Sequence, residues 1–408
     1  MERLECQRAA GADIKIEYSR TRFVRLFQMP WLWALAGPAL LLALLSLRGE
    51  RRSRRYVLSQ LRREPLDCPP ATVIVPVKGQ DEGLRENLAA LASLDYPDFE
   101  LMVAAQRRED IPPGVSPPHA RVVIAGPGDP NTGEKIRNLL AAIAAARPSS
   151  QVLAFADSDG QVRCCWLRAL VAALETPGAG AASGYRHYLP DRASFWPLIR
   201  SVWNSAIAGL FGAGSAPFAW GGAMAMRRDD FERLHIAERW HGQVSDDLAL
   251  TRAVKDAGLR IVFAPGAMVA STDSTTGREF LGWVRRQLTL SRIYDPRLWW
   301  TAFLATLVYC ASIVACVSAA STGAAWALLV LATQLSLGML KGCSRGRLSR
   351  EMFPEREAWF QRYQWIFTWL VPAATWFWLL GFLASASTNV IHWRGNRYAL
   401  SPRGAKKL

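Results

Sequence analysis

The chain has 408 residues, half of them hydrophobic, and its net charge is +15, so it is long enough for a large core and two or more structural units. Much of the positive charge lies beside apolar segments, at 48–63, 341–362 and 394–407, which indicates anionic lipid headgroups rather than nucleic acid. No DNA- or RNA-binding motif is present, and the seven cysteines show no C-x-x-C pair or Cys/His metal spacing, which favours reduced thiols.

Three uncharged blocks are candidates for membrane spans, at 27–47, 298–340 and 365–386. A helix crosses a bilayer in about 20 apolar residues. We therefore expect an N-terminal tail over 1–26, a transmembrane anchor over 27–47, and about three spans in a C-terminal region over 298–388.

The first block has an alternative interpretation as a signal peptide. No clear small-residue cleavage site follows it, and the next residues read "RGERRSRR". Such a basic cluster resists translocation and keeps the following chain in the cytoplasm. This favours a retained anchor followed by a basic linker over 48–70.

Strands and helices alternate between residues 71 and 292. "ATVIVPVKG", "FELMVAAQ", "ARVVIAGPG" and "QVLAFA" have the pattern of buried strands, whereas "EGLRENLAALASL" and "GEKIRNLLAAIAAA" have helical spacing. This alternation predicts an α/β domain with helices on the faces of a parallel sheet. Ligands bind such sheets outside the carboxyl ends of the strands.

Two aspartates, Asp157 and Asp159, stand at one of these strand ends, in "LAFADSDG". Two carboxylates one residue apart can face one hard cation, and Mg²⁺ or Mn²⁺ is often held by one or two carboxylates plus substrate phosphates. Asp-Ser-Asp-Gly is also ordinary turn chemistry, so a solvated turn remains the alternative.

A second acidic pair, Asp246 and Asp247, follows Ser245 in "QVSDDLALTRAVKDAG". Acidic residues are favoured in the first turn of a helix, so capping by Ser245 is one interpretation. The other is a general base within reach of an acceptor hydroxyl. Gly221 and Gly222, in "WGGAMAMRR", permit close backbone approach to a ligand or form a plain turn.

Three arginines, Arg285, Arg286 and Arg292, lie on a predicted helix just before the C-terminal apolar region, in "FLGWVRRQLTLSR". Guanidinium groups match phosphate oxygens bidentately, so this helix is a candidate for stabilising a departing diphosphate. A basic collar beside the membrane is the alternative interpretation.

Taken in order, these motifs resemble the membrane-bound family 2 glycosyltransferases, and most closely the ceramide glucosyltransferase-like branch that includes hopanoid-associated bacterial enzymes. The resemblance covers residues 73–400 and rests on "PVKG", "GEKIRNLL", "FADSDG", "SDDLALT" and "HWRGNRYAL". It implies a glycosyltransferase A-type, Rossmann-like catalytic domain over 71–292, with transmembrane helices at both ends.

The resemblance also implies the roles of individual residues. Asp157 and Asp159 would bind Mg²⁺ or Mn²⁺, and Asp247, with Asp246 beside it, would supply the catalytic base. A further set would bind the donor or line the acceptor loop: Lys78, Lys135, Gly221 and Gly222. The implied donor is of the UDP-sugar type.

The sequence departs from the family pattern in two places. Arg107 stands where the family has an aspartate that contacts the nucleotide, and Glu109 or Asp110 is expected to replace it. Thr289 and Leu290 stand where the Q/R-x-x-R-W signature has its arginine and tryptophan. A glucose donor and a ceramide acceptor therefore do not follow from the resemblance.

Two segments bear on topology. The uncharged stretch 201–226 is long enough to cross a membrane, but a crossing would separate Asp157 from Asp247, so an interfacial helix and loop near 195–220 are expected. Three spans after a cytoplasmic domain place the basic tail 389–408 outside, against the positive-inside tendency. A re-entrant segment around Pro372 is the alternative.

These features predict a multi-pass protein of the cell inner membrane with a cytoplasmic catalytic domain. The predicted reaction is an inverting transfer of a sugar from a nucleotide-sugar donor to a lipid hydroxyl. Two other interpretations remain open: a processive polysaccharide synthase, which needs more spans, and a non-catalytic membrane protein that uses this fold for binding or scaffolding.

Overall fold

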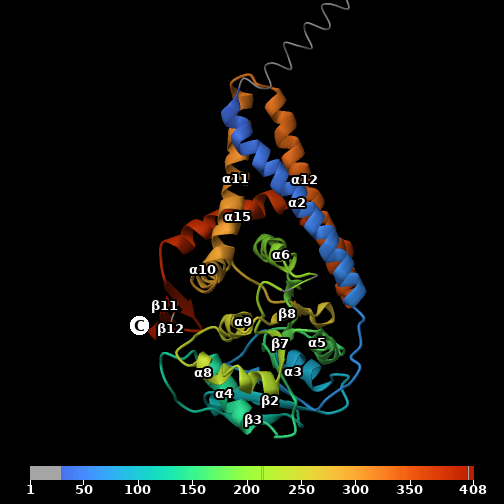
Figure 1. The fold of residues 1–408 in the computed structure, drawn as a ribbon, viewed down its shortest axis with the longest axis vertical. Helices are drawn as coiled ribbons and strands as arrows, with labels where there is room; N and C mark the ends of the chain where they lie inside the picture. The colour runs from blue at the N-terminus through green and yellow to red at the C-terminus, as the bar shows by residue number, and fades with distance from the viewer. Residues whose placement is uncertain (1–28, 213, 215, 403) are drawn as a thin grey trace, which may run out of the picture.

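The computed structural model describes residues 29–408 except 213, 215 and 403, so the expected N-terminal tail over 1–26 lies outside the described residues. Its centre is a seven-stranded sheet in the order β3-β2-β1-β4-β7-β5-β8 (Figure 1). The strands are β1 (Ala71–Pro76), β2 (Phe99–Ala105), β3 (Arg121–Ile124), β4 (Val152–Ala156), β5 (Ala179–Ser183), β7 (Ala223–Arg227) and β8 (Arg260–Phe263). Only β7 runs antiparallel to its neighbours, so the predicted α/β fold is confirmed.

Alternate residues of each strand point to opposite faces, which explains the two layers of helices. Ile74 of β1 is buried with side chains of α4 (Glu134–Ala145) and α9 (Asp246–Asp256). Its neighbour Val73 is buried on the other face with α3 (Leu84–Ala92) and α5 (Trp166–Leu174). Both faces are covered, as expected for strands that read as continuous apolar runs.

The remaining elements of the domain surround this sheet. Strands β6 (Arg186–Tyr188) and β9 (Val269–Ser271) pair in parallel. The other helices are α6 (Phe195–Ala208), α7 (Arg228–Arg233), α8 (Ile236–Trp240) and α10 (Gly277–Tyr294), with short 3₁₀ turns η1 (Arg108–Asp110) and η2 (Pro265–Ala267).

Three long apolar helices project from the domain and run beside one another: α2 (Pro30–Gln60), α11 (Pro296–Ser321) and α12 (Trp326–Met352) (Figure 1). Among the described helices, these three are long and apolar enough to cross a membrane. Small side chains such as Ala36, Ala319 and Ala327 are buried between them. Large ones such as Leu44 and Leu329 remain exposed on their outer surfaces, where lipid would contact them.

The basic segment expected as a linker belongs largely to α2, since the helix continues to Gln60. Arginine, leucine and glutamine favour a helical backbone, and the part from residue 48 to 60 contains no proline. The end of α2 is attached to the catalytic domain by two hydrogen bonds. Ser53 Oγ donates to the Phe211 carbonyl at 2.7 Å, and Tyr56 Oη donates to the Phe263 carbonyl at 2.8 Å.

The third apolar block forms shorter helices than the expected span. After η3 (Pro354–Arg356), the chain forms α13 (Glu357–Tyr363), α14 (Ile366–Trp369) and α15 (Val371–Ala386). Helix α15 has 16 residues and lies across the base of the long helices (Figure 1). It packs against α10, α6 and α11.

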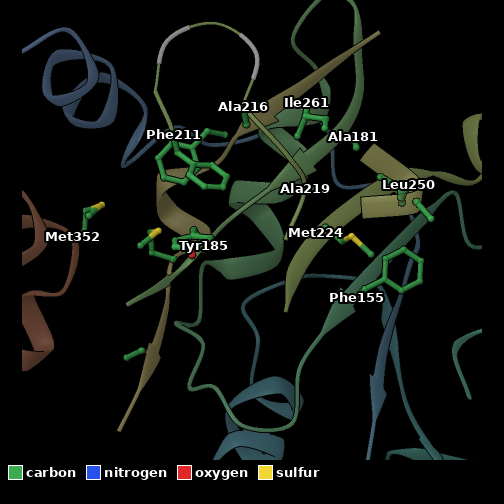
Figure 2. Close-up of a cluster of buried hydrophobic side chains, with 14 of the residues drawn as sticks. Phe155, Ala181, Tyr185, Phe211, Ala216, Ala219, Met224, Leu250, Ile261 and Met352 are labelled. Carbon is green, nitrogen blue, oxygen red and sulfur yellow. The ribbon is translucent and has the colours of Figure 1, made fainter. Parts of the chain in front are cut away.

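The segment 195–220 forms α6 and the loop after it, and it does not separate the two acidic motifs. Trp203 of α6 is fully buried. Phe211 in the loop stacks on Tyr185, with ring centroids 4.8 Å apart (Figure 2). The loop thus packs on the same hydrophobic core as Phe155 of β4 (Figure 2).

The basic tail forms an antiparallel sheet of β10 (Val390–Trp393), β11 (Asn396–Ser401) and β12 (Gly404–Lys407). This sheet lies against the catalytic domain (Figure 1). Ala405 N donates to the Gly242 carbonyl at 2.7 Å, and Lys407 N donates to Asn131 Oδ1 at 3.2 Å. The tail and the catalytic domain are therefore on the same side of the long apolar helices.

Candidate active site

A cavity of about 500 Å³ opens beside the carboxyl ends of β1 and β4, and two groups of the side chains that line it stand out. One group is charged and includes Lys78, Lys135, Asp157, Asp159, Arg186, Asp246, Asp247, Arg286 and Arg394. We call the part that these residues line the charged end. The other group is apolar, comes from α6, α10, α11 and α15, and includes Trp203, Trp283, Leu298, Trp299, Trp378 and Phe382. We call that part the aromatic end.

Asp157 and Asp159 follow β4 directly and face the same cation, the guanidinium of Arg186. Arg186 Nη2 lies 2.5 Å from Asp159 Oδ1 and 3.4 Å from Asp157 Oδ2. Burial raises the pKa of Asp159, but the charge and hydrogen bonds of Arg186 outweigh it, and the net pKa is lowered. The Arg186 guanidinium also lies over the Trp220 ring, 5.0 Å from its centroid, which fixes its position.

Lys135, on α4, joins the two acidic motifs. Its Nζ lies 2.9 Å from Asp157 Oδ1 and 3.1 Å from Asp246 Oδ2, and it donates to the Gly221 carbonyl at 3.2 Å. Burial lowers the pKa of this ammonium, but Asp157, Asp246 and the nearby Asp247 outweigh burial and raise it, so the group stays charged. One buried cation thus holds together parts of the chain that lie far apart in sequence.

Asp246 and Asp247 begin α9 but differ in exposure. Asp246 is 1% exposed, and burial raises its pKa to about 6 even though Lys135 opposes that shift. Asp247 is partly exposed in the cavity and accepts hydrogen bonds from Ser245 Oγ, Leu248 N at 2.8 Å and Gly221 N at 3.2 Å. The Ser245 hydroxyl therefore binds the Asp247 carboxylate and does not cap the helix backbone.

Gly221 and Gly222 are needed because charged side chains approach their backbone closely. A Cβ on Gly221 would lie 2.6 Å from Asp246 Oδ2 and 2.7 Å from Lys135 Nζ. A Cβ on Gly222 would lie 2.7 Å from Asp157 Oδ2 and 2.2 Å from the Trp220 ring. The close approach expected of these glycines occurs, and their neighbours are side chains of the site itself.

Of the three arginines predicted on α10, one lines the cavity. Arg286 lies over the Trp393 ring, 5.5 Å from its centroid, and burial lowers its pKa. Arg285 is exposed on the helix surface. Arg292 instead ties down the end of α15, since it donates to the carbonyls of Ser385 at 3.0 Å and Thr388 at 2.9 Å.

Of the four residues predicted to bind the donor, Lys78 and Lys135 line the cavity and Glu109 and Asp110 do not. Lys78 lines the cavity and forms an ion pair with Glu134 at 2.5 Å. Glu109 and Asp110 do not line it, because they belong to the short turn η1. Asp110 Oδ2 accepts from Arg107 N at 3.0 Å, so this carboxylate stabilises its own turn.

Sequence reasoning missed two cations of the charged end, Arg186 and Arg394. The signal for Arg186 was a charge inside an otherwise uncharged strand, "AASGYRHYL". Arg394 stands in the "HWRGNRY" segment, which supports the family resemblance but does not by itself indicate a role for this arginine. Both lie far along the chain from the carboxylates they approach, so only the fold brings them together.

Within the part of the chain that the structure describes, no group of three or more His, Cys, Asp or Glu side chains is placed to hold a metal ion. Asp157 and Asp159 nevertheless converge on a single cationic group. Carboxylate oxygens are the ligands that Mg²⁺ and Mn²⁺ prefer, and such ions often complete their shell with phosphate oxygens. The donor set therefore fits a divalent cation shared with a bound diphosphate.

Known proteins share the fold of this chain. The chain is similar to the mannosyltransferase PcManGT from Pyrobaculum calidifontis in complex with GDP-Man and Mn²⁺, with a TM-score of 0.51 and 16% identity over 86% of this chain and 98% of that one. A second solved structure, GalNAc-T7 with UDP, GalNAc and Mn²⁺, gives a TM-score of 0.38 and 12% identity over 56% of this chain and 48% of that one. The first likeness establishes a shared fold.

No curated protein matches the sequence. The model of Glycosyl transferase family 21, in contrast, matches residues 31–406, which is nearly the whole chain. The predicted resemblance to ceramide glucosyltransferase-like enzymes is thereby confirmed at the level of the family. The chain belongs to glycosyl transferase family 21 and is a glycosyltransferase.

Proposed function

We infer that this protein transfers a sugar from a nucleotide-sugar donor to the hydroxyl group of a lipid, with inversion at the anomeric carbon. The observation that carries this proposal is the shared cavity. The same cavity is lined by the acidic motifs and by aromatic side chains of α11 and α15, beside the helices suited to a membrane. A lipid hydroxyl can therefore reach the carboxylates while its apolar part stays among the rings.

The donor is proposed to bind at the charged end. PcManGT, which shares this fold, is in complex with GDP-Man and Mn²⁺, and this supports a nucleotide-sugar donor with a divalent ion. A UDP-sugar as the donor rests on family resemblance and stays a proposal. Membership of the hopanoid-associated branch likewise stays a prediction.

Asp157 and Asp159 are the proposed ligands of Mg²⁺ or Mn²⁺. When bound, the ion would neutralise the leaving diphosphate as a Lewis acid. Arg186 already balances these carboxylates, and Lys135 holds Asp157 from the other side. These two cations keep the carboxylates in position.

Asp247 is the proposed general base. A base must reach the acceptor proton, and the partly exposed Asp247 carboxylate can do so whereas the covered Asp246 cannot. Asp247 would accept the hydroxyl proton as the oxygen attacks the anomeric carbon from the face opposite the diphosphate. The hydrogen bonds from Ser245 and Gly221 orient its carboxylate.

The aromatic end is the proposed binding site for the apolar part of the acceptor. Trp203 stacks on Trp378 with ring centroids 3.9 Å apart, and Trp203 and Trp283 meet edge to face at 5.0 Å. Trp283 and Trp378 line the cavity and are partly exposed, whereas the rings of Trp203, Trp299 and Phe382, which also line it, are almost fully buried. Such surfaces bind apolar groups by area and shape and form no specific hydrogen bonds.

The membrane arrangement follows from counting crossings. If α2, α11 and α12 each cross once, the catalytic domain and the C-terminal sheet share one side. The basic residues 48–55, 341–350 and 394–407 then lie on the cytoplasmic side, as the positive-inside tendency requires. We therefore propose a multi-pass protein of the inner membrane in which α15 does not cross.

The test is to incubate membranes containing the protein with labelled nucleotide sugars, Mn²⁺ and a lipid extract. Label that moves into the organic phase with wild type, and not with Asp247→Asn, supports the proposal. Insoluble labelled polymer would instead indicate a polysaccharide synthase. No transfer from any donor would contradict the proposal.

A further inference from the structure

The hairpin between β10 and β11 places an arginine in an unusual backbone conformation. Trp393 pairs with Asn396, so the hairpin turn consists of Arg394 and Gly395. Their φ angles are +47° and +81°. Two-residue turns with positive φ at both positions favour Asn, Asp or Gly, and the left-handed region is uncommon for other residues. Backbone strain of this kind clusters at ligand-binding sites.

Arg394 reaches the catalytic domain from the tip of this hairpin. Its Nη1 lies 2.8 Å from Asp81 Oδ1 and donates to the Lys78 carbonyl at 3.3 Å. Asp81 also accepts from Ser158 Oγ at 2.5 Å, and Ser158 stands between Asp157 and Asp159. A C-terminal residue is thus connected through one carboxylate to the loop of the first acidic motif.

The position of Arg394 suits it to bind an anion. Its side chain is 41% exposed, whereas that of Asp81 is 13% exposed. Lys135 and Arg186, by contrast, are already engaged with the site carboxylates. Helix α10 offers the cavity a single arginine, Arg286, since Arg285 is exposed on the helix surface and Arg292 is bound to the end of α15. Arg394 is itself paired with Asp81, but its side chain is more exposed than those of Lys78, Lys135 and Arg186, so its guanidinium is accessible to a ligand in the cavity.

We propose that Arg394 binds the diphosphate of the donor, so that the C-terminal sheet forms one wall of the donor site. The inference rests on the proposed function of this cavity. The sheet is anchored for this role by the apolar contacts of Ile391, Tyr398 and Leu400 with Leu290 and Ile293 of α10. Arg286 of α10 lies over Trp393 of the same sheet. Arg394 and Arg286 would therefore bring two guanidinium groups to the diphosphate.

The test is to measure the affinity of the purified full-length protein for UDP and for UMP in the presence of Mn²⁺. Arg394→Gln should weaken UDP binding by about 10- to 100-fold, the effect of losing charge-assisted hydrogen bonds. UMP lacks the second phosphate, so its affinity should fall less. Arg394→Lys should restore part of the UDP affinity.

Two control variants separate this role from a structural one. Arg397→Gln removes the same charge from β11 outside the cavity and should leave UDP affinity unchanged. Asp81→Asn breaks the ion pair with Arg394, so a purely structural role predicts the same loss as Arg394→Gln, whereas diphosphate binding predicts affinity equal to or above wild type.

Each outcome has a distinct meaning. Wild-type affinity for UDP in Arg394→Gln, or equal losses in Arg394→Gln, Arg397→Gln and Asp81→Asn, would overturn this inference and leave the proposed function intact. Failure of the wild-type protein to bind UDP, GDP or their sugars would overturn both.

Discussion

The two ends of the cavity are built by different physical means. At the charged end, Lys135 and Arg186 fix three carboxylates, those of Asp157, Asp159 and Asp246, through ion pairs with defined atoms. At the aromatic end, rings such as Trp203, Trp283 and Trp378 pack by shape alone. The energy of an ion pair in a low-dielectric site depends on the positions of single atoms, whereas apolar packing tolerates substitutions of similar volume. Substitutions at the charged end should therefore affect turnover strongly, and those at the aromatic end should affect acceptor affinity moderately.

The largest effect is expected for Asp247→Asn. This change keeps the size of the side chain but removes the base, so turnover should fall by roughly 10²- to 10⁴-fold. Donor affinity should stay near that of wild type, which separates chemistry from binding. Transfer rate and donor affinity are measured together, with Asp256→Asn at the other end of α9 as the control. Near-normal turnover would mean that Asp247 is not the base.

The next effect concerns Lys135→Met, which leaves Asp157 and Asp246 without their shared cation. Removing one partner of a buried ion pair commonly lowers the free energy of unfolding by about 3–5 kcal/mol. Without the Lys135 ammonium, which lowers the pKa of Asp246, burial should raise that pKa further and favour the protonated carboxyl in the folded protein. Thermal unfolding in detergent, compared with the exposed substitution Lys255→Met, measures the effect. Equal stability of the two variants would show that Lys135 does not organise the site.

Metal dependence provides a third test of the charged end. Asp157→Ala combined with Asp159→Ala should abolish the effect of Mg²⁺ or Mn²⁺ on donor binding without unfolding the protein. The remaining metal-independent affinity should be low, since the cavity's arginines then face the diphosphate without the divalent ion. Calorimetric titration of UDP with and without Mn²⁺ decides the matter. An unchanged metal effect in the double variant would remove Asp157 and Asp159 as ligands.

A smaller effect is expected at the aromatic end. Trp378→Leu removes the stacking partner of Trp203, and an aromatic pair of this kind contributes about 0.5–1.5 kcal/mol beyond its buried area. The acceptor KM should rise by about 2- to 10-fold, whereas donor affinity should not change. Trp369→Leu replaces an exposed tryptophan outside the cavity and is the control. A loss of donor affinity in Trp378→Leu would contradict the assignment of donor and acceptor to separate ends of the cavity.

The smallest expected signal comes from topology. A membrane-impermeant thiol reagent should not label His241→Cys in intact cells above the background of native thiols, because the catalytic domain is proposed to be cytoplasmic. Thr322→Cys, in the turn between α11 and α12, should be labelled from outside. Labelling of His241→Cys and protection of Thr322→Cys would reverse the proposed orientation.

The sequence predicted those parts of the molecule that depend on local pattern. Apolar strands predicted the α/β sheet, and acidic residues at a strand end and a helix start predicted Asp157, Asp159, Asp246 and Asp247 as one cluster. The structure places all four in the same cavity. Glu109 and Asp110 were expected there as well but lie in a separate turn, because a short-range capping contact satisfies Asp110.

Long-range partners could not be predicted in this way. Arg186 and Arg394 meet the acidic residues only after β6 and the C-terminal sheet have packed on the domain. Arg292, which has the same chemistry, is instead used to hold the end of α15. Spacing along a helix identifies candidate arginines, but the packing of neighbouring elements decides which of them reaches the cavity.

The central claim is that one cavity joins the donor carboxylates to a lipid acceptor. The most direct measurement follows two products in the same reaction of purified protein: the nucleoside diphosphate released, and the sugar label recovered in the organic phase. We expect that release requires the lipid extract and that one label enters the organic phase for each nucleoside diphosphate released. Release without lipid, with label left in the aqueous phase or in insoluble polymer, would contradict it.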